Sequence, residues 1–271
     1  MDSKLEGLLD SLRETGGVLV AFSAGVDSTF LLRMAHQALQ DRAIALTASS
    51  PTAPPGELEA AQAFAAGLGI RHIVLDSHEL SNPSFVQNPA NRCFFCKDEL
   101  YRICRQQAGR LGVATIVDGT NLDDLRDHRP GLKAAKEWGV RHPLVEAEMT
   151  KEDIRRYSRE LNLPTWDKPS SPCLSSRFPY GTEISVERLK QVGECERFMK
   201  ELGFREFRVR YHGDLARIEV AQTEFGHFFE QATRNAVVKK FKQVGFHYVS
   251  IDLQGYRTGS MNESLAHTPA L

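Results

Sequence analysis

The sequence predicts an α/β protein, with a parallel sheet covered by helices on both faces in the first half of the chain and a smaller α+β domain after it. Three observations lead to this fold class. Short apolar runs alternate with helical patterns in the first half, a proline-rich stretch then interrupts the alternation, and a hairpin-like pattern with further helices follows. The length of 271 residues also suits two domains, because a domain typically has about 150 residues.

The first predicted strand, 18–22, has the wholly apolar sequence VLVAF that is typical of a strand buried on both faces. Strands and helices alternate after it, with strands expected at 43–48, 72–75 and 114–118 and helices at 27–39, 57–68, 94–111 and 150–161. Thr150 is the expected N-cap of the last helix, and Asp153 completes a capping box. Because such helices connect strands by right-handed crossovers, the sheet should be parallel, with ligands at the carboxyl ends of its strands.

Four prolines between residues 164 and 179 predict a long loop without regular structure. We therefore expect a first domain at 1–165, a loop or linker at 166–184 and a second domain at 185–271. The second domain should contain a helix at 185–202, strands at 207–211 and 215–220 around a turn at 212–214, a largely helical segment at 223–244 and a strand at 247–253. The tail after Met261 is expected to be disordered.

The composition indicates an ordinary globular chain, with 41% hydrophobic and 25% charged residues. A formal net charge of −1 argues against binding to nucleic acid through bulk positive charge. No apolar run approaches the roughly 18 residues of a membrane span, and charged residues near the N-terminus interrupt any signal-like sequence. We therefore expect a cytoplasmic protein that binds neither nucleic acid nor membrane.

Residues 23–28, Ser-Ala-Gly-Val-Asp-Ser, connect the first strand to its helix. Small residues there let backbone N–H groups approach an anion, and the helix N-terminus adds a favourable dipole. Asp27 is suited to holding a magnesium ion that bridges a phosphate. The turn contains no lysine, so the sequence does not indicate a P-loop that transfers a γ-phosphate. The alternative is an ordinary capped helix after a strand.

This pattern resembles the PP-loop, SGGxDS, of the N-type ATP pyrophosphatases, which split ATP into AMP and pyrophosphate. It departs at Ala24, where that family usually has glycine; alanine costs some freedom of positive φ. Residues 118–121, Asp-Gly-Thr-Asn, match a second stretch that lines the nucleotide in that family, and Thr47 would lie near the adenine or ribose. The resemblance thus implies that ATP and pyrophosphate are bound by Ser23, Ala24, Gly25, Val26, Asp27, Ser28, Thr47, Gly119 and Asn121.

The chain has five cysteines, and this odd number argues against a disulfide framework. Cys104 and Cys195 lie at helical positions and should only pack. Cys93 and Cys96 form a CxxC pair at the start of a helix, which could be a redox pair, half of a zinc site, two ligands of an iron–sulfur cluster or two packed side chains. Cys173 lies in the proline-rich loop, where nearby Arg177 would favour its thiolate, although loop cysteines are often merely structural.

Arg208 and Arg210 alternate on one face of a predicted strand. Two adjacent guanidinium groups suit a phosphate, which arginine binds with paired hydrogen bonds. The alternative is an exposed edge strand that carries solubilising charges.

Four further stretches, 91–97, 127–131, 166–177 and 256–263, together with residues 23–28 resemble the LarE family of ATP-dependent sulfur transferases across nearly the whole chain. Members adenylate the carboxylates of pyridinium-3,5-biscarboxylic acid mononucleotide and convert them to thiocarboxylates of the nickel-pincer cofactor. The resemblance implies that Cys173 is the catalytic residue, that Arg208 and Arg210 bind the substrate's phosphate, and that the protein uses ATP and Mg²⁺ and forms a homo-oligomer. Trp166, His128 and Arg129 are further candidates for the site.

The source of sulfur has two interpretations. In the family's sacrificial mode the sulfur of Cys173 leaves with the product and dehydroalanine remains, which requires a base for the α-proton. Alternatively, Cys93, Cys96 and Cys173 hold a 4Fe–4S cluster whose open iron carries a sulfide, and we hypothesise a member of this cluster type. Competing functions are a tRNA thiolase, an amide-forming synthetase, and a non-enzymatic ATP-binding module with a zinc or redox CxxC.

Overall fold

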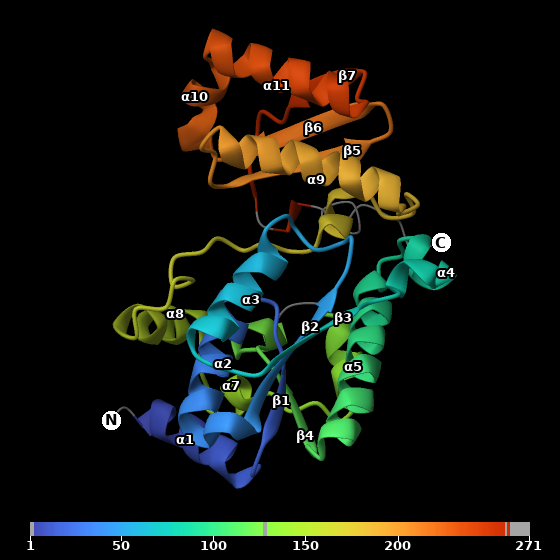
Figure 1. Ribbon diagram of the computed structural model, residues 1–271. Coiled ribbons are helices and arrows are strands. Elements are labelled where there is room, and N and C mark those ends of the chain that lie inside the picture. Colours follow the sequence, from blue (N-terminus) through green and yellow to red (C-terminus); the bar gives the residue numbers. More distant parts are fainter. Residues whose placement is uncertain (1–2, 127–128, 258, 261–271) are drawn as a thin grey trace. The chain divides into compact units, whose positions relative to one another are not determined.

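The computed structural model describes residues 3–126, 129–257 and 259–260 and divides the chain into two compact units (Figure 1). The first unit comprises residues 1–50, 56–85 and 90–171, and the second comprises residues 51–55, 86–89 and 172–271. His128 and the tail after Met261 lie outside the described residues. Two short segments from the first half of the chain therefore belong with the C-terminal part, which the sequence analysis did not anticipate.

The first unit is built on a parallel sheet with strand order β3-β2-β1-β4, counted within the described part of the chain. Its strands are β1 (Val18–Ala21), β2 (Ala43–Ser49), β3 (His72–Asp76) and β4 (Thr115–Asp118). Its helices are α1 (Ser3–Glu14), α2 (Val26–Leu39), α3 (Glu57–Gly67), α5 (Arg92–Leu111), α6 (Gly131–Glu137), α7 (Pro143–Glu146) and α8 (Lys151–Glu160), with 3₁₀ helices at Gln40–Arg42, Glu79–Ser81 and Asp123–Arg126. Helix α4 (Pro83–Val86) lies where the chain passes between the units. The predicted fold class is confirmed.

Strand β1 lies at the centre of this sheet because its alternating side chains enter two separate cores. Val18 and Val20 pack in a core with residues of α1, α2 and α8, whereas Leu19 and Ala21 pack in a core with residues of α5 and α6. The apolar sequence of β1 therefore reflects burial on both faces, as predicted.

The capping box of helix α8 is present as predicted. Thr150 Oγ1 accepts the Asp153 amide at 3.2 Å, and Asp153 Oδ2 accepts the Thr150 amide at 3.1 Å. Lys4 also reaches Asp153 at 2.7 Å. Although burial by itself would raise the pKa of the Asp153 carboxyl, the hydrogen bonds from Lys4 and Thr150 lower it to about 2.

The second unit is a small α+β body whose sheet has the order β5-β6-β7 in the described residues. Its elements are α9 (Val186–Glu201), β5 (Phe207–His212), β6 (Leu215–Val220), α10 (Phe225–Phe229), α11 (Gln231–Val244) and β7 (Tyr248–Ile251), with 3₁₀ helices at Leu174–Arg177 and Gln222–Glu224. Strands β5 and β6 pair antiparallel, and β7 pairs parallel to β6. The helix expected over 223–244 is interrupted between α10 and α11.

The loop that carries Cys173 is fixed within the second unit by backbone hydrogen bonds to the two early segments. The Leu174 amide donates to the Thr52 carbonyl at 2.7 Å, and the Gly181 amide donates to the Asn88 carbonyl at 2.9 Å. The prediction of a loop without regular structure needs one correction, since Leu174–Arg177 forms a 3₁₀ helix directly after Cys173. Prolines do not prevent this turn, because none occupies its four positions.

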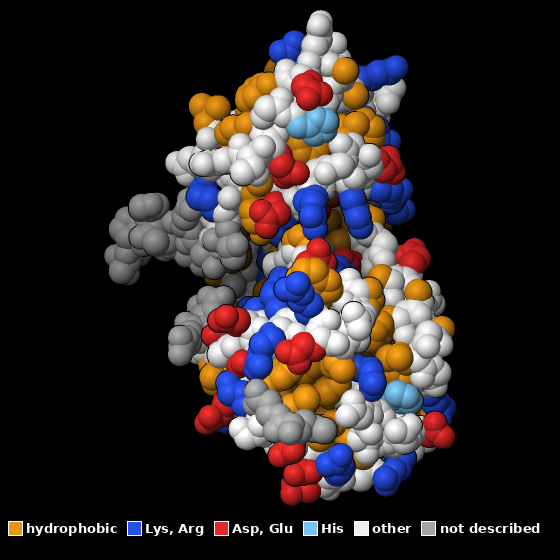
Figure 2. All heavy atoms as spheres, turned by 90° about the vertical axis from the view of Figure 1, so that its left-hand side faces the viewer, with side chains coloured by type: hydrophobic (Ala, Val, Ile, Leu, Met, Phe, Trp, Pro, Cys, Tyr) orange, Lys and Arg blue, Asp and Glu red, His pale blue; other side chains and the backbone are white. Residues whose placement is uncertain are grey.

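Surface charges of both signs are interspersed on the face that Figure 2 shows, as a net charge of −1 suggests. Among the residues described, no helix combines the length and the apolar character needed to cross a membrane. Cys104 and Cys195 are fully buried, which confirms that they pack. Burial raises the pKa of the Cys104 thiol to about 12.

Candidate functional site

The bend at residues 23–28 joins β1 to α2 and presents the amino end of that helix. Gly25 is the N-cap, and no side chain caps the first amides of the helix. The hydroxyls of Ser23 and Ser28 lie 3.1 Å apart, and Ser28 Oγ donates to the Gly25 carbonyl at 3.3 Å. Uncapped amides at a helix N-terminus together with two hydroxyl groups form a suitable receptor for a phosphate group.

Ala24 adopts a left-handed conformation, with φ of +53°. This is the position at which the PP-loop pattern usually has glycine, and the structure shows why: the bend requires positive φ there. An L-residue in this region costs about 1 kcal/mol relative to glycine. Ala24 is only 2% exposed and packs in the core shared by α1 and α2, so its methyl group gains contacts that offset part of this cost.

Gly119 follows β4 and lies directly against the bend. A Cβ atom at this position would be 2.8 Å from the Ser28 amide nitrogen and 3.1 Å from the Asp27 carbonyl carbon. No side chain can occupy that space without moving the backbone of the bend. The structure therefore brings together residues 23–28 and 118–121, as the sequence analysis predicted for the carboxyl ends of two parallel strands.

Asp118, the last residue of β4, is buried and forms several hydrogen bonds. Its Oδ2 accepts the Tyr101 hydroxyl at 2.5 Å, and its Oδ1 lies 2.7 Å from His142 Nδ1 and accepts the Thr120 amide at 3.1 Å. Lys97 lies 3.9 Å away. Burial alone would raise the pKa of the Asp118 carboxyl, but the hydrogen bond from His142 and the charge of Lys97 lower it well below its usual range. An ionised Asp118 thus anchors the loop that contains Gly119.

Asp27 lies in the first turn of α2, and one of its oxygens contacts Lys151 Nζ at 2.5 Å. The other oxygen, Oδ1, is buried and has no hydrogen-bond partner among the described residues. A carboxylate oxygen without a partner beside a phosphate receptor fits a magnesium ion, because Mg²⁺ prefers hard oxygen ligands and shares them with phosphates. The sequence analysis identified Asp27 but missed Lys151.

The side chains of Thr47 and Asn121 form hydrogen bonds with backbone groups near the bend. The Thr47 hydroxyl donates to the Phe22 carbonyl at 2.8 Å and lies 2.8 Å from His72 Nε2. Burial lowers the pKa of His72, which favours its neutral form. The side-chain oxygen of Asn121 accepts the Asp123 amide at 3.0 Å and so starts the following 3₁₀ helix. Both side chains hold the loops that surround the bend.

Cys93 and Cys96 lie in the first turn of α5, one exposed and the other half-buried. Their spacing places two sulfur donors on one side of the helix, which suits two ligands of a metal or cluster. Within the described part of the chain, however, no group of three or more His, Cys, Asp or Glu side chains is arranged to hold a metal ion. Cys93 and Cys96 belong to the first unit, and Cys173 belongs to the second.

Two further candidates lie on the surface of the first unit. Arg129 forms an ion pair with Asp124 at 2.7 Å. Trp166 is 39% exposed, with the guanidinium of Arg159 5.3 Å from the centre of its ring. With this exposure, Trp166 is a surface residue and not part of the core.

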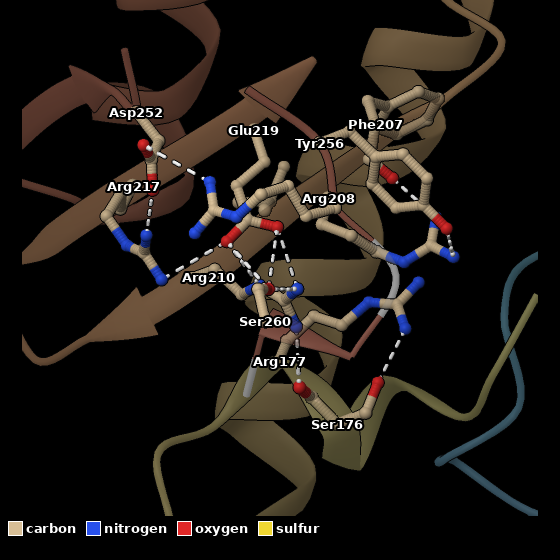
Figure 3. Close-up of polar contacts among 12 residues, drawn as sticks. Ser176, Arg177, Phe207, Arg208, Arg210, Arg217, Glu219, Asp252, Tyr256 and Ser260 are labelled. Atoms are coloured by element: carbon tan, nitrogen blue, oxygen red, sulfur yellow. Dashed lines mark hydrogen bonds and ion pairs between the residues drawn. The ribbon is translucent and has the colours of Figure 1, made fainter. Parts of the chain in front are cut away.

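Buried arginines surround the start of β5 in the second unit (Figure 3). Arg210 forms paired hydrogen bonds with Glu219, at 3.0 and 2.7 Å, and also contacts the Ser260 hydroxyl at 2.8 Å. Arg208 reaches the Tyr256 hydroxyl at 3.2 Å. Only 8% of Arg208 and 4% of Arg210 is exposed, so the alternative of solubilising charges on an exposed edge is wrong.

Arg177 binds Glu196 through paired hydrogen bonds of 2.8 and 2.9 Å. The fully or largely buried charged side chains of this unit are thus three arginines and two glutamates within the described residues: Arg177, Arg208, Arg210, Glu196 and Glu219. Burial, together with the neighbouring charges of Arg177 and Arg210, lowers the pKa of Arg208. Guanidinium groups gathered in this way suit a bound anion such as a phosphate.

Cys173 lies four residues before Arg177, the first arginine of this cluster along the chain. Arg177 donates to the Cys173 carbonyl at 3.3 Å and to the Pro172 carbonyl at 2.9 Å, and Arg210 donates to the Ser176 carbonyl at 2.9 Å. Arg177 also donates to the Ser176 hydroxyl at 2.7 Å, and its guanidinium pairs with Glu196, whereas its influence on the Cys173 thiol stays a prediction. Arg177 therefore shapes the loop that carries the thiol.

Sequence reasoning missed several residues around the bend of the first unit and in the arginine cluster of the second: Tyr101, His142, Lys151, Lys168, Glu196 and Glu219. None of them belongs to a glycine-containing turn or a CxxC pair, and single charged residues within helices and strands carry no local signal of burial. Glu219 alternates with apolar residues in β6, which would have placed it on a definite face but not beside a particular arginine.

Replacing Gly119 with alanine should weaken nucleotide binding, because the new methyl group would displace the Ser28 amide from the phosphate receptor. Overpacking typically costs 1–3 kcal/mol, so we expect about 10-fold to 100-fold weaker binding of ATP. Calorimetric titration with Mg–ATP measures this. Gly109→Ala is the matched control, since a Cβ at Gly109 meets nothing within 4 Å. Equal affinity of the Gly119 variant and the control would contradict this role.

Comparisons with known proteins bear on this site. The sequence profile of the NAD synthase family matches residues 4–91, which include β1 and the bend. The chain is 25% identical over 225 residues to a glutamine-hydrolysing GMP synthase of Bacillus cytotoxicus, covering 74% of this chain and 43% of that protein.

Two relatives match almost from end to end. The chain is 37% identical over 266 residues to pyridinium-3,5-bisthiocarboxylic acid mononucleotide synthase of Lactiplantibacillus plantarum, covering 97% of this chain and 95% of that protein. It is 46% identical over 265 residues to an uncharacterised protein of Synechocystis, covering 98% and 99% respectively. Together with the PP-loop geometry of the bend, these matches show that the chain is an ATP-utilising enzyme of the PP-loop type and belongs to the LarE family of sulfur transferases.

Proposed function

We propose that this enzyme adenylates the carboxylates of pyridinium-3,5-biscarboxylic acid mononucleotide and converts them to thiocarboxylates. The observation that carries the proposal is the buried arginine cluster, attached to the loop of Cys173 in one unit. A phosphate-bearing substrate suits this cluster, and a thiol next to it suits sulfur transfer. The relative in Lactiplantibacillus is named for the corresponding product.

The first step is activation of the acid. A carboxylate oxygen of the substrate attacks the α-phosphorus of ATP, the bond to the β-phosphate oxygen breaks, and pyrophosphate leaves. The uncapped amides of α2 and the hydroxyls of Ser23 and Ser28 would bind the leaving pyrophosphate. Magnesium bound with ATP would neutralise the charge that develops there, and Asp27 would hold it through its buried Oδ1. The product is an acyl-adenylate, in which AMP is a good leaving group.

Sulfur transfer follows on the acyl-adenylate. In the sacrificial route the Cys173 thiolate attacks the acyl carbon and AMP leaves, which gives a thioester. A base then removes the α-proton of Cys173, and the Cβ–S bond breaks with its electron pair on sulfur. The thiocarboxylate is released and dehydroalanine remains. In the alternative route, Cys93, Cys96 and Cys173 would hold a cluster, and sulfide rather than the sulfur of Cys173 would be delivered.

Cys173→Ala should separate the two halves of the reaction. The variant retains the bend, so it should release pyrophosphate from Mg–ATP in the presence of the biscarboxylate nucleotide, while no thiocarboxylate forms. Coupled pyrophosphate detection and mass spectrometry of the nucleotide measure the two steps. A pyridinium nucleotide without carboxylates is the control and should release none. If the wild-type protein binds ATP but releases no pyrophosphate with any carboxylate, the proposal is wrong.

Arg208→Ala should weaken binding of the pyridinium nucleotide and leave ATP binding unchanged. A charge-assisted hydrogen bond contributes about 1.5–3 kcal/mol, so the KM for the nucleotide should rise about 10-fold to 100-fold. Arg208→Lys keeps the charge and should recover part of the loss. Arg197→Ala, on the exposed side of α9, is the matched control. Loss of ATP binding in the Arg208 variant would instead show that the arginine has another role.

The two sulfur sources should differ in the mass of the protein after turnover, in bound iron and in the number of turnovers. If Cys173 is sacrificed, mass spectrometry after one turnover will find this residue converted to dehydroalanine and the yield limited to one sulfur per chain. If the three cysteines hold a cluster, anaerobic reconstitution with iron and sulfide will give bound iron, an unchanged mass after turnover and repeated turnovers. Cys93→Ala should then abolish iron binding. Full multi-turnover activity in that variant, or failure of the wild-type protein to bind iron, would discard the cluster.

A further inference from the structure

Lys168 makes two interactions that neither adenylation nor sulfur transfer as described above requires. Its ammonium group donates to the Ala24 carbonyl at 3.0 Å and forms an ion pair with Glu57 at 2.6 Å. It lies within the first unit, and its side chain is 24% exposed. Ala24 is the residue of the bend with positive φ. Lys168 therefore contacts the peptide group between Ala24 and Gly25, which shapes the phosphate receptor.

The geometry of one peptide unit explains what this contact can do. The Ala24 carbonyl and the Gly25 N–H belong to the same planar peptide group, and no cis peptide occurs in the described chain. In a trans peptide these two bonds point in opposite directions. An ammonium group that holds the carbonyl oxygen therefore fixes the direction of the N–H. It also polarises the amide, which makes the N–H a stronger donor to an anion.

The same lysine lies close to Cys173 along the chain. The backbone of Lys168 is held by Arg155, which donates to the Lys168 carbonyl at 2.8 Å and to the Trp166 carbonyl at 2.7 Å. Cys173 follows Lys168 by five positions, so the Cα atoms of the two residues lie at most about 18 Å apart. The connection therefore limits how far the thiol can move from the point at which Lys168 is anchored.

Glu57 strengthens this arrangement because of its place in the chain. It begins α3 and follows by two residues the segment 51–55, which belongs to the second unit. That segment supplies the Thr52 carbonyl, to which the Leu174 amide donates at 2.7 Å. The Lys168–Glu57 ion pair thus joins two stretches of chain. Each stretch lies a few residues from a point at which the chain passes from one unit to the other. One continues into the loop of Cys173, and the other follows the segment that binds this loop through Thr52.

We propose that Lys168 is a positioning residue that couples occupancy of the pyrophosphate receptor to the conformation of the Cys173 loop. An anion on the Gly25 N–H strengthens the hold of Lys168 on the Ala24 carbonyl, and this fixes the start of the segment that carries the thiol. By reciprocity, a fixed loop strengthens binding of the anion. The inference rests on the proposed function, in which the thiol must act only once the acid has been activated.

The alkylation rate of Cys173 tests the coupling without any turnover. Iodoacetamide is applied with and without Mg²⁺ and an ATP analogue that cannot be cleaved between its α- and β-phosphates, and each cysteine is followed by peptide mass spectrometry. Coupling energies between sites are typically equivalent to about 5-fold to 150-fold, so the wild-type rate at Cys173 should change at least about 5-fold. Cys93, exposed in the first unit, is the internal reference.

Lys168→Met should remove the nucleotide dependence, leaving one rate at Cys173 in both conditions, and Lys168→Arg should restore part of it. Lys136→Met, an exposed lysine on α6, is the matched control and should behave as the wild type. If the methionine variant keeps the full nucleotide dependence, or the wild-type rate does not respond, the inference is wrong. Pyrophosphate release by the wild type, measured in parallel, shows whether the proposed function stands in either case.

Discussion

The close approach of the Gly119 backbone to Ser28 is the contact on which the proposed nucleotide receptor depends. Strands β1 and β4 are neighbours in register, with Ala21 opposite Asp118, so the chain leaves both strands at the same level of the sheet. The bend and the loop after β4 must therefore share a small volume. Only glycine fits at position 119, because the Cβ of any other residue would lie 2.8 Å from the Ser28 nitrogen.

The remaining features of the first unit preserve that contact. Asp118 stays ionised because His142, Tyr101 and Lys97 surround its carboxylate, and a carboxylate with fixed partners holds the adjacent loop in one position. Lys168 donates a hydrogen bond to the Ala24 carbonyl within the bend itself. The strained φ of Ala24 is thus maintained by packing and by hydrogen bonds, which is the usual way in which proteins keep an unfavourable backbone conformation at a site.

The distinctive feature of the second unit is that a small body buries several guanidinium groups. Arg177 and Arg210 each form paired hydrogen bonds with a glutamate, which fixes the orientation of both guanidinium groups. Arg208 is adjacent to both, and burial near their charges lowers its pKa. Such a cluster is costly for stability alone, so its presence beside the loop of Cys173 is best explained by an anionic ligand.

The sequence by itself determined the parts of the protein that depend on local patterns. The apolar run at 18–22, the alternation of strands with helices and the capping box at Thr150 all follow from periodicity and backbone chemistry, and the structure has them. The meeting of residues 23–28 with Gly119 was also predictable, because parallel strands bring their carboxyl ends to one edge.

Only the tertiary structure decided which charged side chains are buried and what they contact. Lys151, Lys168 and Glu196 lie in segments whose composition is that of an ordinary surface, and no local pattern pairs them with Asp27, Ala24 or Arg177. These contacts join residues 19 to 144 positions apart. Helical and strand periodicity determines the face of the element on which a side chain lies. Packing between distant segments then determines which residues that side chain contacts.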